Sequence, residues 1–273
     1  WSTMLVISCI KQVPDTTQVK IDPVTNTLIR EGVPFIMNPF DTHALEESLR
    51  LKDRYGFRVA AISMGPPNAE TTLRKALAAG ADQVVLLSDR AFGGADTLST
   101  SRVLAEAVRR LGEAEDVALV LCGKQTIDGD TAQTGPGIAT RLGYAQLTLV
   151  DRVEFVDTAR RIVRVRRKLE GRHEIVEAPL PAVITVVREI NKPRYPTVPR
   201  RLSAQQAQIP VWNNEVLQLD VQTIGLKGSP TQVNKIFSPE RAKGEIIGDG
   251  VHDPDGTAHL LLERLLAKDL LNL

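Results

Sequence analysis

Apolar runs of strand length alternate with helical patterns along the first half of the chain. The four runs occupy residues 4–10, 57–64, 82–88 and 117–123. Apolar positions recur at helical spacing between them, over 41–55, 69–80 and 96–112. The last two segments end in Gly80 and Gly112, a residue type that commonly terminates helices. Strands that are apolar on both faces and alternate with helices predict an α/β fold with a doubly wound, mostly parallel sheet.

Beyond Leu147 the pattern changes to alternating apolar and polar positions. Three segments alternate in this way, at 147–157, 161–171 and 172–178. They predict antiparallel strands, so we expect an added hairpin over 147–178. The apolar segment 180–189 predicts a buried strand that returns to the sheet.

The last part of the chain lacks this regularity. Residues 191–216 contain four prolines and little periodicity, so they cannot bury much of themselves and we expect an extended arm. An amphipathic helix is expected over 259–273. We therefore divide the chain into an α/β domain at 1–190, which includes the hairpin, and an arm with a C-terminal segment at 191–273.

Composition narrows the classes of function. A net charge of +1 and an aromatic content of 4% give no argument for a nucleic-acid partner. Two cysteines, Cys9 and Cys122, lie in predicted strands, which favours a reducing compartment over a disulfide scaffold. The sequence has no apolar run of membrane-spanning length, and no basic region precedes its first apolar run, so we expect neither membrane insertion nor a secretory signal. Isolated histidines predict no metal site, and no catalytic triad or carboxylate pair stands out.

Small and polar residues gather at one predicted edge of the sheet. In an open parallel sheet, ligands bind beyond the carboxyl ends of the strands. The segments that follow the four strands are "CIKQVPD", "SMGPPNAE", "SDRAFGGADT" and "GKQTIDGDTAQTGPG". The opposite loops are plain glycine stops, so the sequence predicts a single ligand edge.

The fourth of these segments has the composition of a phosphate-binding turn. Gly123 and Gly129 permit unusual backbone angles, and Pro136 suits the first turn of a helix that begins near Gln133. Amide groups over 131–135 would then lack intrahelical partners, and the small side chains there allow an anion to approach. We therefore predict a phosphate or pyrophosphate site, to which Thr131, Gln133 and Thr134 add side-chain donors.

A structural explanation of the same residues stays open. Asp128 and Asp130 would also serve to cap a helix at a surface loop. The segment is neither a Walker loop nor the glycine fingerprint of a dinucleotide fold. Two other helix starts have a similar form.

At the first of these, Asn38 lies ahead of a helix that we expect Asp41 to cap. At the second, Asp96 is a candidate cap with Thr97 in the first turn. At both helix starts the alternative is a purely structural role, in which the residues form a turn and a helix cap and bind no ligand.

Six motifs together resemble one known family. They are "MNPFD", "AISMGPP", "ALAAGAD", "GKQTIDGDTAQTGP", "LPAVITV" and "NKPRYPTVP", in order from Met4 to Pro199. The combination resembles the small (beta) subunit of electron-transfer flavoprotein. The resemblance implies a domain related to the adenine-nucleotide alpha-hydrolase folds, paired with an alpha subunit that carries FAD. It also implies a C-terminal segment that wraps the partner subunit.

The family has two branches that differ in the nucleotide of the beta subunit. In the ordinary branch it is a structural AMP, and the protein shuttles single electrons from dehydrogenases to a quinone reductase. In the electron-bifurcating branch it is a second FAD, which takes hydride from NADH and splits the electrons between high- and low-potential acceptors. The small residues of "DGDTAQTGPG" and the segment "CIKQVPD" resemble the bifurcating branch, although Thr126 stands where Ala is more usual. We therefore expect FAD, with AMP as the alternative.

The resemblance also implies which residues bind the cofactor. Those at the phosphates are Gly123, Asp128, Gly129, Asp130, Thr131, Ala132, Gln133 and Thr134; those on the ring side are Cys9, Lys11 and Val13; and those on the adenosine and ribitol side are Asn38, Ser63, Met64, Asp96 and Thr97. Lys11 would stabilise an anionic reduced flavin, or would be a solvated loop lysine.

In this family the proline-rich arm is a recognition loop. The resemblance makes Val198 the apolar anchor that docks into a partner dehydrogenase, beside Arg194, Tyr195, Arg200 and Arg201. The alternative is that Val198 packs against the alpha subunit. A partner dehydrogenase or quinone reductase, with or without an iron–sulfur subunit, is implied. We expect a prokaryotic cytoplasmic protein, at the inner membrane face only through a partner. A nucleotide-sensing module of the universal-stress type is the alternative of another class, and the long arm argues against it.

Overall fold

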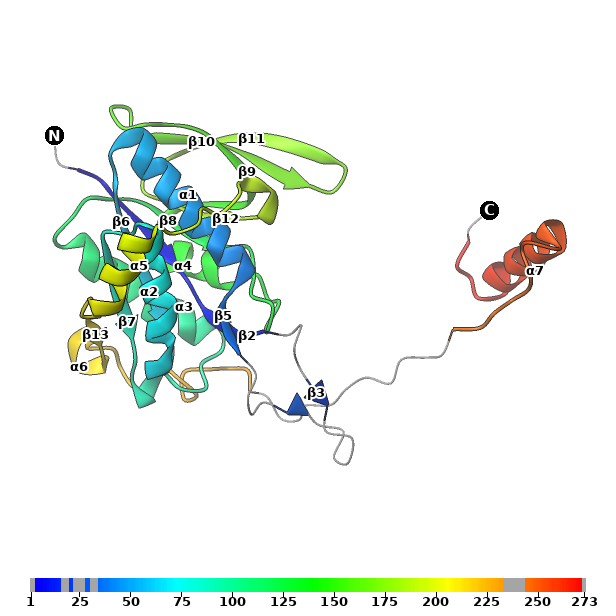
Figure 1. The fold of residues 1–273 in the computed structure, drawn as a ribbon, viewed down its shortest axis with the longest axis horizontal. Helices are drawn as coiled ribbons and strands as arrows, with labels where there is room; N and C mark the ends of the chain where they lie inside the picture. The colour runs from blue at the N-terminus through cyan, green and yellow to red at the C-terminus, as the bar shows by residue number, and fades with distance from the viewer. Residues whose placement is uncertain (1–2, 16–19, 22–27, 30–33, 233–243, 272–273) are drawn as a thin grey trace. The chain divides into compact units, whose positions relative to one another are not determined.

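The computed structural model describes residues 3–15, 20–21, 28–29, 34–232 and 244–271. The chain forms two compact units, residues 1–234 and 235–273. The first unit is built on a nine-stranded sheet with the order β11-β10-β9-β12-β8-β1-β6-β7-β13 (Figure 1). In chain order the strands are β1 (Leu5–Cys9), β6 (Arg58–Met64), β7 (Gln83–Leu87), β8 (Val117–Gly123), β9 (Ala145–Asp157), β10 (Ile162–Leu169), β11 (Arg172–Pro179), β12 (Ala182–Val186) and β13 (Val211–Trp212).

The sheet confirms the predicted fold class. All pairings from β9 across to β13 are parallel, and β10 and β11 add an antiparallel extension at the β9 edge. Strands β1 and β12 are buried along their whole length, and β8 is buried up to Gly123, because helices cover both faces. The apolar runs identified in the sequence are therefore the strands of a two-sided core.

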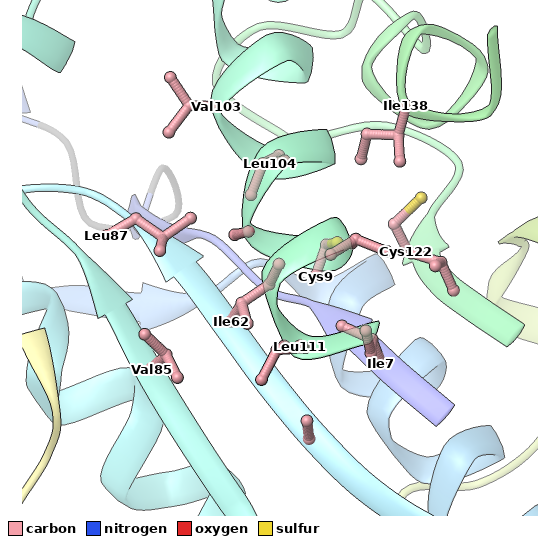
Figure 2. Packing of buried hydrophobic residues seen from close by; sticks show 14 of the residues in the cluster. Ile7, Cys9, Ile62, Val85, Leu87, Val103, Leu104, Leu111, Cys122 and Ile138 are labelled. Carbon is pink, nitrogen blue, oxygen red and sulfur yellow. The ribbon is translucent and has the colours of Figure 1, made fainter. Parts of the chain in front are cut away.

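Helices α1 (Pro39–Tyr55) and α2 (Glu70–Ala79) cover one face of the sheet, and α3 (Thr97–Gly112) and α4 (Thr134–Leu142) cover the other. Short 3₁₀ turns lie at Pro67–Ala69, Arg90–Phe92 and Arg188–Ile190. Figure 2 shows the core under α3 and α4, where Val103, Leu104 and Ile138 lie over side chains of the central strands.

The order of the strands reverses at β1. The chain continues from β1 to β6 and β7 on one side, and β8 and β12 lie on the other side. Cys9 and Cys122, the register partners near the ends of β1 and β8, mark this switch point. The chain leads from β1 to α1 and from β8 to α4, and these two helices lie on opposite faces of the sheet, so this edge is where an open α/β sheet binds its ligands.

Two short ladders lie outside the main sheet. β2 (Gln12–Pro14) pairs antiparallel with β5 (Phe35–Met37), and β3 (Lys20–Ile21) pairs antiparallel with β4 (Leu28–Ile29). Neither ladder was predicted, since strands of two or three residues carry no periodic signal. The β2–β5 pair fixes the loop after β1 against the start of α1.

The proline-rich segment from Asn191 contains structure that its sequence did not predict. Helix α5 (Val198–Gln206) packs on α2, where Ala204 is buried, and β13 pairs with β7; a short helix, α6 (Asn214–Leu217), follows. The guanidinium group of Arg74 donates to the carbonyls of Ala204 and Gln205. The first part of the predicted arm thus belongs to the same compact unit as the sheet.

The second unit contains one described helix, α7 (Pro254–Ala267). It begins earlier than the predicted start at His259, because Asp253 caps it by accepting a hydrogen bond from the amide of Gly256. Its leucines are partly exposed within this unit. Among the described residues, no helix is long and apolar enough to span a bilayer.

Candidate functional site

The start of α1 anchors the loop that follows β8. Asn38, which is fully buried, donates from its amide to the carbonyl of Gln125 at 2.9 Å and accepts from the amide of Ile127 at 3.2 Å. The prediction that Asp41 caps this helix was wrong. The helix already begins at Pro39, and Asn38 holds the N-cap position without a side-chain cap bond. Asn38 therefore fixes the 123–127 loop to the start of α1 through two hydrogen bonds.

Asp41 joins two loops through a buried carboxylate. Its Oδ2 accepts from the backbone amide of Lys11 at 2.9 Å, and its Oδ1 accepts from the amide of Gly123 at 3.0 Å. Burial raises the pKa of Asp41 to about 7, although these two hydrogen bonds, the Asn38 side chain and the Lys11 charge lower it. Sequence reasoning missed this role, since an aspartate in the first turn of a helix is an ordinary feature.

The loop between β8 and α4 turns sharply at two side-chain-bearing residues. Asp130 has φ 50° and Ala132 has φ 56°, both in the left-handed region. The expected unusual angles at Gly123 and Gly129 are not present, because neither has positive φ. The Asp130 turn is closed by its own amide, which donates to the carbonyl of Thr126 at 2.9 Å, and by the Gln125 side chain at 2.7 Å from its carboxylate.

This loop leads into α4, whose N-terminus has no side-chain cap. Helix α4 begins at Thr134, one residue after the expected start, and its N-cap residue Gln133 makes no side-chain cap bond. The first amides of such a helix have no intrahelical acceptor and carry the positive end of the helix dipole. A side chain at Gly135 would collide with Thr185 and lie 2.9 Å from the Cys122 sulfur, so α4 sits close on the sheet.

Two pairs of predicted site residues meet across this edge. The Thr97 hydroxyl, at the start of α3, donates to the side-chain oxygen of Gln133 at 3.0 Å. The Lys11 ammonium lies 2.7 Å from Asp128, although both side chains remain partly exposed. Partial burial alone would raise the pKa of Asp128, but its bonds with Lys11 and Thr126 and the Lys11 charge lower it. Lys11 is thus a paired cation that ties the loop after β1 to the loop after β8.

The remaining ring-side residues are largely covered by protein. Figure 2 shows Cys9 and Cys122 on the same face of the sheet as Ile138. Both are free thiols, and burial raises the pKa of each. Val13 is fully buried in β2.

The predicted adenosine-side residues have separate surroundings. Ser63 is buried near the end of β6, and its hydroxyl has no hydrogen-bond partner among the described residues. Met64 is partly buried against the core. Asp96 does cap α3, accepting from the amide of Ser99 at 3.0 Å, and its second oxygen accepts from the amide and hydroxyl of Thr231. The carboxylate of Asp96 is therefore committed to protein groups.

Arg194 anchors the start of the predicted docking segment on α1. Both Nε and Nη2 of Arg194 donate to Glu46, and Nη2 also donates to Asp53 at 2.8 Å. The backbone amide of Arg194 donates to Glu46 as well. The side chains of Tyr195 and Val198, with exposed fractions of 95% and 68%, then project from the surface.

A groove of about 650 Å³ lies between this segment, α1 and α2. Apolar side chains such as Leu45 and Leu49 lie along it, and Lys75 and Arg201 are at its exposed border. The groove is on the α1–α2 side, apart from the α4 N-terminus.

The edge loops fit a phosphorylated nucleotide by their donor chemistry. Thr131, Ala132 and Gln133 are exposed around an uncapped helix N-terminus, and none has a bulky side chain that would exclude a phosphate. The facing loop carries Lys11, whose ammonium is paired with Asp128. The described residues contain no cluster of side chains suited to a metal ion.

Comparison with known proteins identifies the family. The family model for the electron transfer flavoprotein domain matches residues 25–217. The chain is 47% identical over 265 residues to the protein FixA of Azotobacter vinelandii, covering 96% of this chain and 94% of that protein. It is 48% identical over 251 residues to the electron transfer flavoprotein subunit beta of Clostridium acetobutylicum, covering 92% of this chain and 94% of that protein.

A third relative is named as part of a larger assembly. The caffeyl-CoA reductase-Etf complex subunit CarD of Acetobacterium woodii is 45% identical over 271 residues, which covers 98% of this chain and 100% of that subunit. Identities of this size over nearly whole chains leave no room for a different fold. The chain therefore belongs to the electron transfer flavoprotein family, among its beta subunits.

Proposed function

We propose that this chain pairs with an electron transfer flavoprotein alpha subunit and holds an FAD at the loop between β8 and α4. In this proposal the bound flavin accepts hydride from NADH, and its electrons pass to a high-potential and a low-potential acceptor. Family membership supports an electron-transfer role over the nucleotide-sensing alternative. The relative named as a subunit of a caffeyl-CoA reductase complex supports a partner enzyme of the acyl-CoA type.

One observation carries the assignment of the cofactor. The uncapped N-terminus of α4 lies behind a loop of small residues in which Ala132 itself takes a left-handed conformation. A bulkier residue at this position would crowd the path of a diphosphate, whereas Ala132 leaves room for one. The arrangement suits the diphosphate of FAD, which needs more space and more donors than the single phosphate of AMP.

The residues of this chain would bind and orient the cofactor. The first amides of α4 would donate to the phosphates, and Thr131 and Thr134 would add hydroxyl donors. The flavin supplies the hydride and one-electron chemistry, while the protein sets its orientation and potential. Asn38 and Asp41 would keep the two loops at a fixed separation.

The AMP alternative is favoured by one contact. Because Lys11 is paired with Asp128 at 2.7 Å, its charge is partly neutralised before any flavin binds. A structural AMP would need no such cation beside it. The two readings predict different cofactor contents.

Cofactor content is the first test. We expect the purified alpha–beta heterodimer to release two FAD and no AMP on acid treatment, measured by chromatography against the protein concentration. One FAD with one AMP would overturn the bifurcating proposal and leave a one-electron shuttle. Titration of the two-FAD form with NADH under anaerobic conditions would then test whether it accepts hydride.

The docking role of Val198 makes a second prediction. Truncating a hot spot of an interface costs about 2 kcal/mol or more, which corresponds to about 30-fold, so Val198→Ala should lower kcat/KM for electron transfer with a bacterial acyl-CoA dehydrogenase by about 30-fold or more. The matched control is Val221→Ala, since Val221 is also exposed and lies outside the segment. Equal losses in the two variants, or none in either, would count against docking through Val198.

We also propose a cytoplasmic location, with membrane association only through a partner.

A further inference from the structure

Two loops of the proposed cofactor site donate hydrogen bonds to one buried carboxylate, that of Asp41. The loop after β1 reaches Asp41 through the amide of Lys11, and the end of β8 reaches it through the amide of Gly123. The Asp41 side chain is almost fully buried in the first turn of α1, and α1 packs on the sheet over most of its length. The carboxylate thus has a fixed position, and the loops are placed relative to it.

We infer that Asp41 is a positioning residue that clamps the loop after β1 to the loop after β8 in its ionised state and releases one of them when it is protonated. The inference rests on the proposed function, because it assumes that these loops hold a nucleotide. It requires no contact between Asp41 and the ligand. The effect of Asp41 passes through the two backbone amides.

The proton dependence follows from the hydrogen-bond inventory of a carboxyl group. An ionised carboxylate accepts with both oxygens, so both amides are satisfied. A protonated carboxyl has one oxygen that carries a hydrogen, and an amide facing that oxygen is left with a much weaker acceptor. Because burial raises the pKa of Asp41 to about 7, this exchange occurs near neutral pH. The clamp is closed above that pH and open below it.

Other charged groups around Asp41 do not compete in this range. The groups that face it are the ammonium of Lys11 on the loop, the Cys9 thiol on β1 and the Cys122 thiol on β8. Burial raises the pKa of both thiols, so they stay protonated around neutrality. Lys11 is held by Asp128, whose pKa is lowered and which therefore stays ionised.

The test compares nucleotide affinity in Asp41→Asn with the wild-type heterodimer at pH 6 and pH 8. Asparagine keeps the size of the side chain but presents one acceptor and one donor, which matches the protonated acid. The probe is FAD added to heterodimer whose beta-subunit nucleotide has been removed, with AMP as a second probe. Taking the ratio of the two Kd values at each pH cancels any titration of the ligand.

We expect the variant to bind about tenfold or more weakly than wild type at pH 8, the loss typical of a hydrogen bond to a charged group. At pH 6 the two proteins should differ by about threefold or less, since both then present one acceptor. The control is Glu47→Gln on the same helix. Glu47 is buried and its pKa is raised by burial, but its hydrogen bonds go to Asn191 and Arg50 and to neither loop. Its ratio should stay near one at both pH values.

Three outcomes would overturn the inference: a pH-independent loss, no loss at pH 8, or tighter binding by the variant at pH 8, which would show that Asp41 repels the phosphate. If Asp41→Asn does not fold, hydrogen exchange on the wild-type protein replaces it. After correction for intrinsic rates, the amides of Lys11 and Gly123 should be less protected at pH 6 than at pH 8, and equal protection would overturn the inference. Binding of AMP but not FAD by wild type would defeat the proposed cofactor while leaving this test intact.

Discussion

Gly123→Ala is expected to abolish tight nucleotide binding and to destabilise the protein. A methyl group at this position would collide with Phe40 and lie 2.6 Å from the Asp41 carboxylate, so either α1 or the end of β8 must move. Overpacking of this kind costs about 1–3 kcal/mol of unfolding free energy. In a chain of this size each kcal/mol lowers Tm by about 2–4 °C. Because Asp41 accepts from the Gly123 amide, the shift also breaks the link between the two loops.

Calorimetry and nucleotide titration of the heterodimer would measure both effects. The matched control is Gly129→Ala in the same loop, where the nearest atom to an added methyl is the Thr126 hydroxyl at an ordinary 3.4 Å. Gly129 also lacks a positive φ, so the substitution should leave Tm almost unchanged. If the two alanine variants behave alike, the close approach of Gly123 to α1 is not what fixes the loop.

Arg194→Ala should destabilise the protein and slow electron transfer to its partner together. The substitution leaves Glu46 buried without its cation, and breaking such a pair by removing one partner costs about 3 kcal/mol. The hydrogen bonds that Arg194 donates to Glu46 and Asp53 raise the pKa of Arg194, as expected for a guanidinium group held by two carboxylates. Without this anchor the turn that carries Tyr195 loses its attachment to α1, while Val198 stays at the start of α5, which packs on α2.

The control for this prediction is Arg200→Ala. Arg200 is exposed and makes one long hydrogen bond, at 3.3 Å, to the carbonyl of Ala79. Its loss should leave the free energy of unfolding within about 0.5 kcal/mol of the wild-type value. An association rate with the partner that is lower than that of wild type at low salt, and equal to it at high salt, would show a purely electrostatic docking role. An Arg194→Ala variant with unchanged Tm would contradict the structural role of the Glu46 pair.

Elements with long periodic patterns were predicted well from the sequence. Strands β1, β6, β7 and β8 and helices α1 to α3 lie within two residues of their predicted bounds, because burial on both faces or on one helix face leaves a regular apolar pattern. Helix α5 was missed, since the three prolines before Arg200 concealed its short pattern. Its stability comes from packing on α2 and from the Arg74 hydrogen bonds, which involve residues more than 100 positions away.

In the candidate site, too, the features with a local sequence signal were predicted, and the features that depend on distant contacts were not. The open start of α4 was predicted within one residue from Pro136 and the small residues before it. The left-handed residues were not, because the sequence gives glycine the preference while the structure places the turn at Asp130 and Ala132. The role of Asp41 was missed for a related reason. Its two partners lie 30 and 82 residues away in the chain, so only the folded structure brings them to one carboxylate.

Helix α1 carries both the loop anchors and the anchor of the docking segment. Asp41 lies in its first turn, and Glu46, which holds Arg194, follows about 7.5 Å farther along the helix axis. A helix buried against a sheet does not stretch, so these two attachment points keep a constant separation. Electron transfer depends steeply on distance. For a partner that docks on the Tyr195–Val198 segment, α1 would therefore set the distance between the docking site and the proposed cofactor site. Partners with different surfaces would have this same distance.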